Sequence, residues 1–523
     1  MRTSAHVGFL PVLFSLLLNI GGAVDICAAD TVYLKNGRRM VGTVVKRTPE
    51  KVVLDLGIGS VTFRVSEISS IEDGPVSFPG QPTPISRATL PTTPVGAPDP
   101  AVAAFPSTPS VALPSSLPAS ADVIQLADVL LPVVSALRGL AVRSPVEKRL
   151  ADKATVRNIV QREMAKRHSN DALARKGKAL IKLGLLPPYV NLQEYVIHLY
   201  THQLAGMYDP DTNTLYLADW IPAQMQAGVV AHELVHALQD QHFDLLRYMK
   251  DVEGNSEAQA ARQAVVEGEA MAIMLDYHLM EQGRSFTSLG NPAEWIDQLL
   301  AALREQDPSA SSMPTYLQET ALFPYINGLA FLQAVCKRHP WSWVATLYDD
   351  PPRSTEQILH PDKYLVTRDD PTLVTLVDVQ DLLGEGWSLL DEDVAGEFTM
   401  KSLVRQYAPA VDAVAVAAGW DGDRYRLYEE AASSQLLLVW VSVWDSEADA
   451  AEFLRAYRQL IVEKYLEAQP VEGLADSWRT ESGYVHLAQL RERVVIVEGA
   501  PTPHPHAFIQ RLQLSNSTPP TGS

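Results

Sequence analysis

The sequence predicts a multidomain α+β protein with a small N-terminal β-barrel, a mainly helical middle domain and a C-terminal α+β module. Its 523 residues are 46% hydrophobic and 20% charged, a globular composition at a length that usually means two or three domains. The hydrophobic pattern alternates in the strand manner at first, becomes helical after residue 121 and is mixed after about residue 375. A segment rich in Pro, Ser and Thr separates the first two parts.

Charge and cysteine content exclude two classes of protein. Sixty-two acidic residues against 43 Lys and Arg give a net charge of -19, and the isoelectric point is about 5.1. Nucleic acid is therefore not expected as a partner, because binding a phosphate backbone needs clustered positive charge. The two cysteines, Cys27 and Cys336, cannot form a disulfide framework.

Residues 1–29 are typical of a secretory signal peptide. An apolar run from Val7 to Val24 follows Arg2, and small residues at Cys27 and Ala29 suit signal cleavage. We expect an exported protein, periplasmic or extracellular, or one held by an N-terminal membrane anchor if the signal is not cleaved.

Residues 30–73 alternate between apolar and polar side chains in five short runs, which predicts a small β-barrel. Its expected role is to stabilise the fold or to contact the cell envelope. Residues 74–120 are dominated by Pro, Ser, Thr and Ala, so we expect a disordered linker without a packed core.

Residues 121–372 show helical periodicity, interrupted by a hairpin whose strand is expected at Thr214–Ala218. Residues 375–515 are predicted to form an α+β domain with a buried strand from Leu436, a helix after it and a terminal hairpin. The tail, residues 516–523, is rich in Ser, Thr and Pro and is expected to be disordered.

The sequence His232-Glu233-Leu234-Val235-His236 predicts a metal site. In a helix the two histidines are one turn apart and point the same way, while Glu233 lies beside them. Zn²⁺ is the expected ion, because imidazole suits it and two nitrogens plus one carboxylate leave a position for water. Glu233 would then act as the general base on that water.

A third ligand is required, and His242 is one candidate. It has the spacing of the third ligand in metzincins, but Gln239 stands where that class needs a helix-breaking Gly. If the helix continues, His242 lies about 9 Å further along the axis than His236.

Glu267 and Glu269 are the other candidates. Both lie on a helix predicted from Ser256 to Gln282, with a capping box formed by Ser256 and Gln259. Apolar residues flank both carboxylates, so periodicity does not choose between them. A carboxylate in an apolar face is costly unless it is paired or bound to metal.

The run HELVHALQDQHFD followed by VVEGEA resembles the gluzincin class of zinc peptidases, and in particular a group of exported bacterial proteins that share HALQDQHFD. The similarity covers roughly residues 135–365. It implies a zincin-like metallopeptidase domain for residues 121–372, with Glu267 as the third zinc ligand. The strand at Thr214–Ala218 resembles the edge strand along which zincins hold an extended peptide.

Peptide hydrolysis also needs a donor for the developing oxyanion, and His360, Tyr325 and Tyr364 are candidates. Ser354 is expected to cap a helix together with Gln357.

The predicted function is that of an exported zinc peptidase acting on a peptide or protein substrate. The catalytic residues would be Glu233, His360 and Tyr325, and the metal ligands His232, His236 and Glu267. The alternative is a cell-envelope binding or scaffold protein with a structural or vestigial zinc site. The sequence does not indicate the oligomeric state.

Overall fold

The computed structural model describes residues 30–35, 39–48, 51–55, 60–72, 123–167, 172–203, 206–221, 223–295, 314–503 and 506–518. The chain divides into two compact units, of which one contains residues 30–72 and the other residues 123–518. The expected signal peptide (1–29) and linker (74–120) lie outside the described residues. Within those ranges no helix is long and apolar enough to cross a membrane.

The first unit is a five-stranded antiparallel sheet with strand order β4-β3-β2-β1-β5. The five predicted strands are thus present, and β4 and β5 are the two ends of the sheet order. Their bounds are β1 (Asp30–Leu34), β2 (Arg39–Arg47), β3 (Lys51–Asp55), β4 (Ser60–Arg64) and β5 (Ile68–Glu72).

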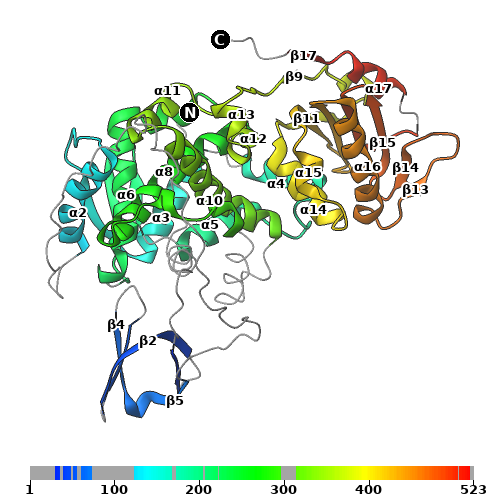
Figure 1. Cartoon of the computed structure of the whole chain (residues 1–523). Helices are drawn as coiled ribbons and strands as arrows, with labels where there is room; N and C mark the ends of the chain where they lie inside the picture. The colour runs from blue at the N-terminus through cyan, green and yellow to red at the C-terminus, as the bar shows by residue number, and fades with distance from the viewer. Residues whose placement is uncertain are drawn as a thin grey trace, which may run out of the picture. The chain divides into compact units, whose positions relative to one another are not determined.

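The second unit begins with a mainly helical part (Figure 1). Its elements are α2 (Val123–Arg138), β6 (Glu147–Ala151), α3 (Lys153–Arg167), α4 (Ala172–Leu183), α5 (Leu192–Gln203), β7 (Gly206–Asp209), β8 (Thr214–Ala218), α6 (Ala223–Phe243), α7 (Leu245–Lys250), α8 (Ser256–Leu279), α10 (Thr315–Arg338), α11 (Thr346–Asp349), α12 (Thr355–Leu359) and α13 (Asp362–Leu365).

Helix α8 lies at the centre of this part and packs against both α6 and α10, while α2 packs on α6 (Figure 1). The middle of α8 is buried on all sides, as expected for a helix enclosed by others. Helices α8 and α10 cross closely at Gly268 and Gly328, since a Cβ built on Gly268 would overlap the carbonyl group of Gly328.

A three-stranded sheet with the order β6-β8-β7 lies beside α6. Strand β8 pairs with β6 in parallel and with β7 in antiparallel fashion. The strand expected at the sheet edge, Thr214–Ala218, is therefore the central strand, and β7 is the edge strand in contact with α6. The sequence identified the hairpin but could not show that residues 147–151 pair with β8.

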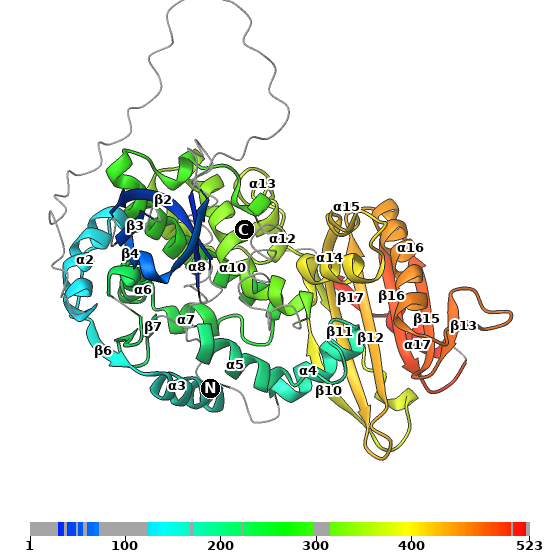
Figure 2. The ribbon, with the colours of Figure 1, turned by 90° about the horizontal axis from the view of Figure 1, so that it is seen from below.

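The C-terminal part contains a seven-stranded sheet with the order β10-β11-β12-β16-β15-β14-β13, in which each pair is antiparallel (Figure 2). The bounds are β9 (Leu373–Thr375), β10 (Trp387–Asp393), α14 (Gly396–Tyr407), α15 (Ala413–Ala417), β11 (Trp420–Glu430), β12 (Leu436–Trp444), α16 (Glu447–Lys464), β13 (Gln469–Pro470), β14 (Ser477–Thr480), β15 (Gly483–Leu490), β16 (Arg493–Ala500), α17 (His506–Gln513) and β17 (Asn516–Thr518).

Strand β12 explains how both faces of this sheet are covered. Its side chains alternate between the faces, so Leu438 and Trp440 pack with residues of α14, α15 and α16, whereas Leu437 and Val439 pack with residues of β9 and α17. This is why the run from Leu436 is almost entirely apolar. The predicted α+β character of the C-terminal part is confirmed.

Two details differ from expectation. Helix α8 is capped by Asn255, which accepts a hydrogen bond from the Ala258 N–H, and not by Ser256. The start of the tail was expected to be disordered, but residues Asn516–Thr518 form strand β17, which pairs with β9. Residues 123–372 and 375–515 lie in one compact unit. The predicted cap at Ser354 is confirmed, since its side chain accepts from the Gln357 N–H.

Candidate metal centre

Helix α6 carries the two histidines and the first glutamate of the site. His232, Glu233 and His236 are all buried. Apolar residues on the remaining faces of the helix, including Val230 and Leu234, are also fully buried. The imidazole rings are 4.7 Å apart, centroid to centroid, as one helical turn of separation requires.

Helix α8 places Glu267 against these rings. Its Oε2 atom lies 3.1 Å from Nε2 of His232 and 3.4 Å from Nε2 of His236. The two Nε2 atoms are 3.0 Å apart. Three ligand-type atoms from two helices therefore converge on one point, and none of the three side chains is exposed by more than 1%.

This spacing suits a tetrahedral metal ion. Donors at the usual Zn²⁺ distances of about 2.0–2.1 Å lie about 3.3 Å from one another in a tetrahedron. The three observed separations bracket that value. Two imidazole nitrogens and one carboxylate oxygen are also a donor set that zinc prefers. The residues present therefore fit a zinc ion.

Gln239 fixes the orientation of one ring. Its Oε1 atom lies 2.8 Å from Nδ1 of His236, and its amide donates to the Val266 carbonyl at 3.0 Å. The Gln239 side chain thus directs Nε2 of His236 towards Glu267. It also joins α6 to α8 at Val266, the residue before Glu267. Such contacts to the outer nitrogen set the tautomer of a metal-binding histidine.

Glu233 is held by strand β7. The Tyr208 N–H donates to its Oε2 at 3.0 Å, while Oε1 is buried and has no hydrogen-bond partner among the described residues. A Cβ on Gly206 would lie 3.1 Å from Cγ of Glu233, so glycine lets the strand approach the carboxylate. Because the Tyr208 N–H donates to Glu233, this N–H of the edge strand β7 is not available to pair with another strand.

Burial and charge shift the pKa values at the site. Burial lowers the pKa of His232 to about 4, which keeps the imidazole neutral and its lone pair available. Burial raises the pKa of Glu233 to about 7. Burial also acts to raise the pKa of Glu267, but the contacts with the two histidines outweigh it and hold that pKa below its usual range.

The other two candidates for the third ligand lie elsewhere. Helix α6 continues to Phe243 without a break, and Nε2 of His242 contacts the Ala141 carbonyl at 2.8 Å. Glu269 is buried but forms an ion pair with Arg138 and accepts a hydrogen bond from Tyr348 at 2.5 Å. Both buried oxygens of Glu269 thus have partners, as a buried carboxylate requires.

Of the proposed oxyanion donors, Tyr325 is beside the site. It lies on α10, is 3% exposed, and its ring centroid is 6.2 Å from that of His232.

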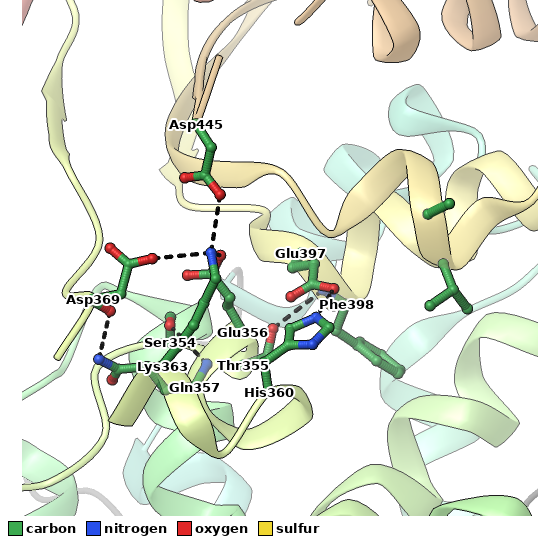
Figure 3. A network of polar contacts seen from close by, with 12 residues as sticks. Ser354, Thr355, Glu356, Gln357, His360, Lys363, Asp369, Glu397, Phe398 and Asp445 are labelled. Atoms are coloured by element: carbon green, nitrogen blue, oxygen red, sulfur yellow. Dashed lines mark hydrogen bonds and ion pairs between the residues drawn. The ribbon is translucent and has the colours of Figure 1, made fainter. Parts of the chain in front are cut away.

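His360 belongs to a different group of residues, drawn in Figure 3. Its Nε2 atom contacts Oε1 of Glu397 at 2.9 Å, between α12 and α14. Tyr364 donates to the Asp350 carbonyl at 2.5 Å. The structure therefore brings Tyr325 to the metal centre and gives His360 and Tyr364 contacts that do not involve it.

A second cluster of acids, Glu356, Asp369 and Asp445, also has ligand-type spacing. The ammonium group of Lys363 lies among the three carboxylates, at 2.6, 3.0 and 3.1 Å (Figure 3). This cluster is thus a lysine-centred ion-pair network that joins α12 and α13 to the end of β12.

Sequence reasoning missed the roles of Gln239 and Arg138. Gln239 had a local signal, because a polar side chain three positions after His236 faces the same side of a helix. Arg138 had none, since it lies 131 residues from Glu269 in the chain.

Comparison with known proteins gives one family match. Residues 387–507 are similar to a family described as a domain of unknown function (DUF8575), and this range contains all seven strands of the C-terminal sheet. No curated protein and no solved structure matches the chain.

Proposed function

We propose that this protein is a zinc-dependent peptidase in which His232, His236 and Glu267 hold the metal and Glu233 is the general base. One observation carries the proposal: three buried donor atoms stand at tetrahedral spacing, beside a buried carboxylate on the same helix. A site that only stabilised the fold would not need Glu233, whose Oε1 has no protein partner in the described parts of the chain.

His232, His236 and Glu267 would hold the zinc ion, which would supply a Lewis acid to the reaction. Glu233, oriented by the Tyr208 N–H, accepts a proton from the attacking water and delivers it to the leaving amine. The hydroxyl of Tyr325 is the proposed donor to the carbonyl oxygen of the scissile bond, because its ring lies beside His232. Buried apolar residues around α6 keep the site in a low dielectric, which strengthens these interactions.

The proposal also includes a zincin-like fold for the helical part, export from the cell and a closed N-terminal barrel. The resemblance of HELVHALQDQHFD and VVEGEA to gluzincins supports the first, and the apolar run from Val7 to Val24 supports the second. The five-stranded antiparallel sheet is compatible with the third.

The test is the substitution Glu233→Gln, which keeps the size of the side chain but removes its basicity. We expect zinc content to stay at the parental level and the rate of peptide hydrolysis to fall about 10²–10⁴-fold. Glu253→Gln is the matched control, because Glu253 is exposed in the turn between α7 and α8. Metal content is measured by elemental analysis and hydrolysis with a library of quenched fluorescent peptides.

The proposal fails if Glu233→Gln cleaves as fast as the parent protein. It also fails if the zinc-loaded parent cleaves nothing in the library. Bound zinc without turnover would favour the alternative, a cell-envelope binding or scaffold protein with a structural metal.

A further inference from the structure

A cavity of about 320 Å³ lies between the helical and C-terminal parts of the second unit. This is within the size range of pockets that bind small ligands. Its walls come from α4, α5, α8, α10, α14 and β11 and are mostly apolar. They include Leu180, Leu192, Val196, Tyr316, Phe398 and Tyr425.

One end of the cavity is lined by residues that lie close to the candidate metal centre. Tyr325 lines the cavity and also packs beside the ring of His232. Gln263, another wall residue, is one helical turn before Glu267 on α8. From Tyr325 the wall follows α10 back to Tyr316, a distance of about 13 Å along the helix axis.

The lysine and the glutamate of the wall, Lys176 and Glu257, already have hydrogen-bond partners. The Lys176 ammonium donates to Asp393 at 2.6 Å and to the Tyr425 hydroxyl at 2.9 Å. Glu257 accepts from the Thr355 hydroxyl at 2.7 Å and from its N–H. A charged ligand would lose its water of hydration here, and these two paired side chains would not replace it. An apolar ligand would instead gain free energy from burial.

The C-terminal part supplies one side of this cavity. Val394 and Ala395, just before α14, and Phe398 and Thr399, in its first turn, contribute to the wall, and Tyr425 contributes from β11. Without these residues the cavity would lack its wall on this side.

We propose that this cavity binds a bulky apolar residue of the peptide substrate, and that the C-terminal part completes it as a specificity wall. The inference rests on the proposed peptidase function. It assigns a role in substrate selection to the sheet region that matches a domain of unknown function.

Two substitutions fill the cavity from opposite sides. Ala321→Phe acts from α10 and Val394→Phe from the C-terminal part. Val414→Phe is the control, since Val414 lies on α15 outside the cavity and is 57% exposed. The peptide substrates differ at one residue, which is Phe, Leu, Ala or Asp. One set varies a residue before the cleaved bond, and a second set varies a residue after it.

We expect the parent to prefer Phe and Leu over Asp by at least about tenfold in kcat/KM at one position. Each filling variant should lose about tenfold for the Phe peptide and change little for the Ala peptide, with zinc content unchanged. Val414→Phe should behave as the parent. Equal cleavage of the Phe and Asp peptides at every position, or unaltered selectivity in both folded filling variants, overturns the inference.

A binding measurement separates this inference from the proposed function. Binding of N-acetyl-L-phenylalanine amide to the full chain is followed by ligand-observed NMR and needs no turnover. If the parent cleaves no peptide but binds the amide, and both filling variants lose that binding, the peptidase proposal fails and the apolar pocket stands. If the parent does not bind the amide, the pocket is overturned even where peptides are cleaved.

Discussion

Three glutamates near the candidate metal centre are equally buried but differ in what each carboxylate contacts. Glu267 faces two imidazole rings, Glu233 accepts one backbone N–H, and Glu269 is paired with Arg138 and Tyr348. Since all three are fully buried, burial does not distinguish their roles. In the proposed peptidase, the neighbours of each oxygen decide whether it binds the metal, accepts a proton or stabilises the fold.

The two glutamates on α8 should therefore give opposite phenotypes. Glu267→Ala is expected to lose bound zinc. Glu269→Leu should keep zinc but lower the free energy of unfolding by about 3–5 kcal/mol, because it leaves Arg138 buried without its partner. Elemental analysis and urea denaturation measure the two effects. Loss of zinc in the Glu269 variant alone would reverse the assignment of the ligand.

Gln239 is expected to act on metal affinity through His236. Replacing it by Met keeps the volume but removes the contacts with Nδ1 of His236 and with the Val266 carbonyl. We expect zinc affinity to fall about 10–100-fold. Competition with a chromogenic chelator measures it. His242→Ala is the control and should leave the affinity unchanged, and a parental affinity in the Gln239 variant would contradict the role.

At the level of elements, the crossing of α8 and α10 sets the position of two site residues. Gly268 follows Glu267 directly, and Gly328 lies one turn after Tyr325. The absence of side chains at both glycines lets the two helices touch backbone to backbone. The same crossing thus brings Glu267 and Tyr325 to the two histidines of α6.

Gly268→Ala should separate these helices. Its Cβ would overlap the backbone of Gly328, so we expect a loss of about 1–3 kcal/mol in unfolding free energy together with weaker zinc binding. Gly290→Ala is the control, because a Cβ there meets no atom within 4 Å. Thermal denaturation with and without zinc measures both effects, and a parental transition in the Gly268 variant would show that the crossing adapts without cost.

At the level of the whole second unit, buried acids join the helical and C-terminal parts. Glu257, at the start of α8, accepts from Thr355 of α12 and lies against Gly396 at the start of α14. Burial raises the pKa of Glu257 to about 8, and the nearby carboxylates of Asp423 and Glu397 act in the same direction. The junction therefore favours a protonated carboxyl.

This junction predicts that stability falls as the pH rises. The folded protein holds a proton on Glu257 that the unfolded chain, with a pKa near its ordinary value of about 4.5, has already lost. Between pH 6.5 and 8 the unfolding free energy should decrease by up to about 1.4 kcal/mol per pH unit through this group. Glu257→Gln should flatten that slope in urea denaturation, and a parental slope in the variant would contradict the assignment.

The sequence by itself determined the local features of this protein. The one-turn spacing of His232 and His236 follows from helical geometry, and the alternation in β12 follows from the pleat of a strand. The cap at Ser354 depends on a residue only three positions away. Such features depend on neighbours within one or two turns of the chain, so a pattern of residue types is enough to predict them.

Only the tertiary structure decided between candidates that local pattern left equal. Glu267 and Glu269 have similar flanking residues. Glu267 meets the rings of His232 and His236, which are 35 and 31 residues away, whereas Glu269 meets Arg138, which is 131 residues away. The structure also places Tyr325 beside His232 and His360 against Glu397, and it makes β7 the edge strand in place of β8. A buried carboxylate or ring takes its role from the atoms that replace its water, and the packing of distant elements supplies those atoms.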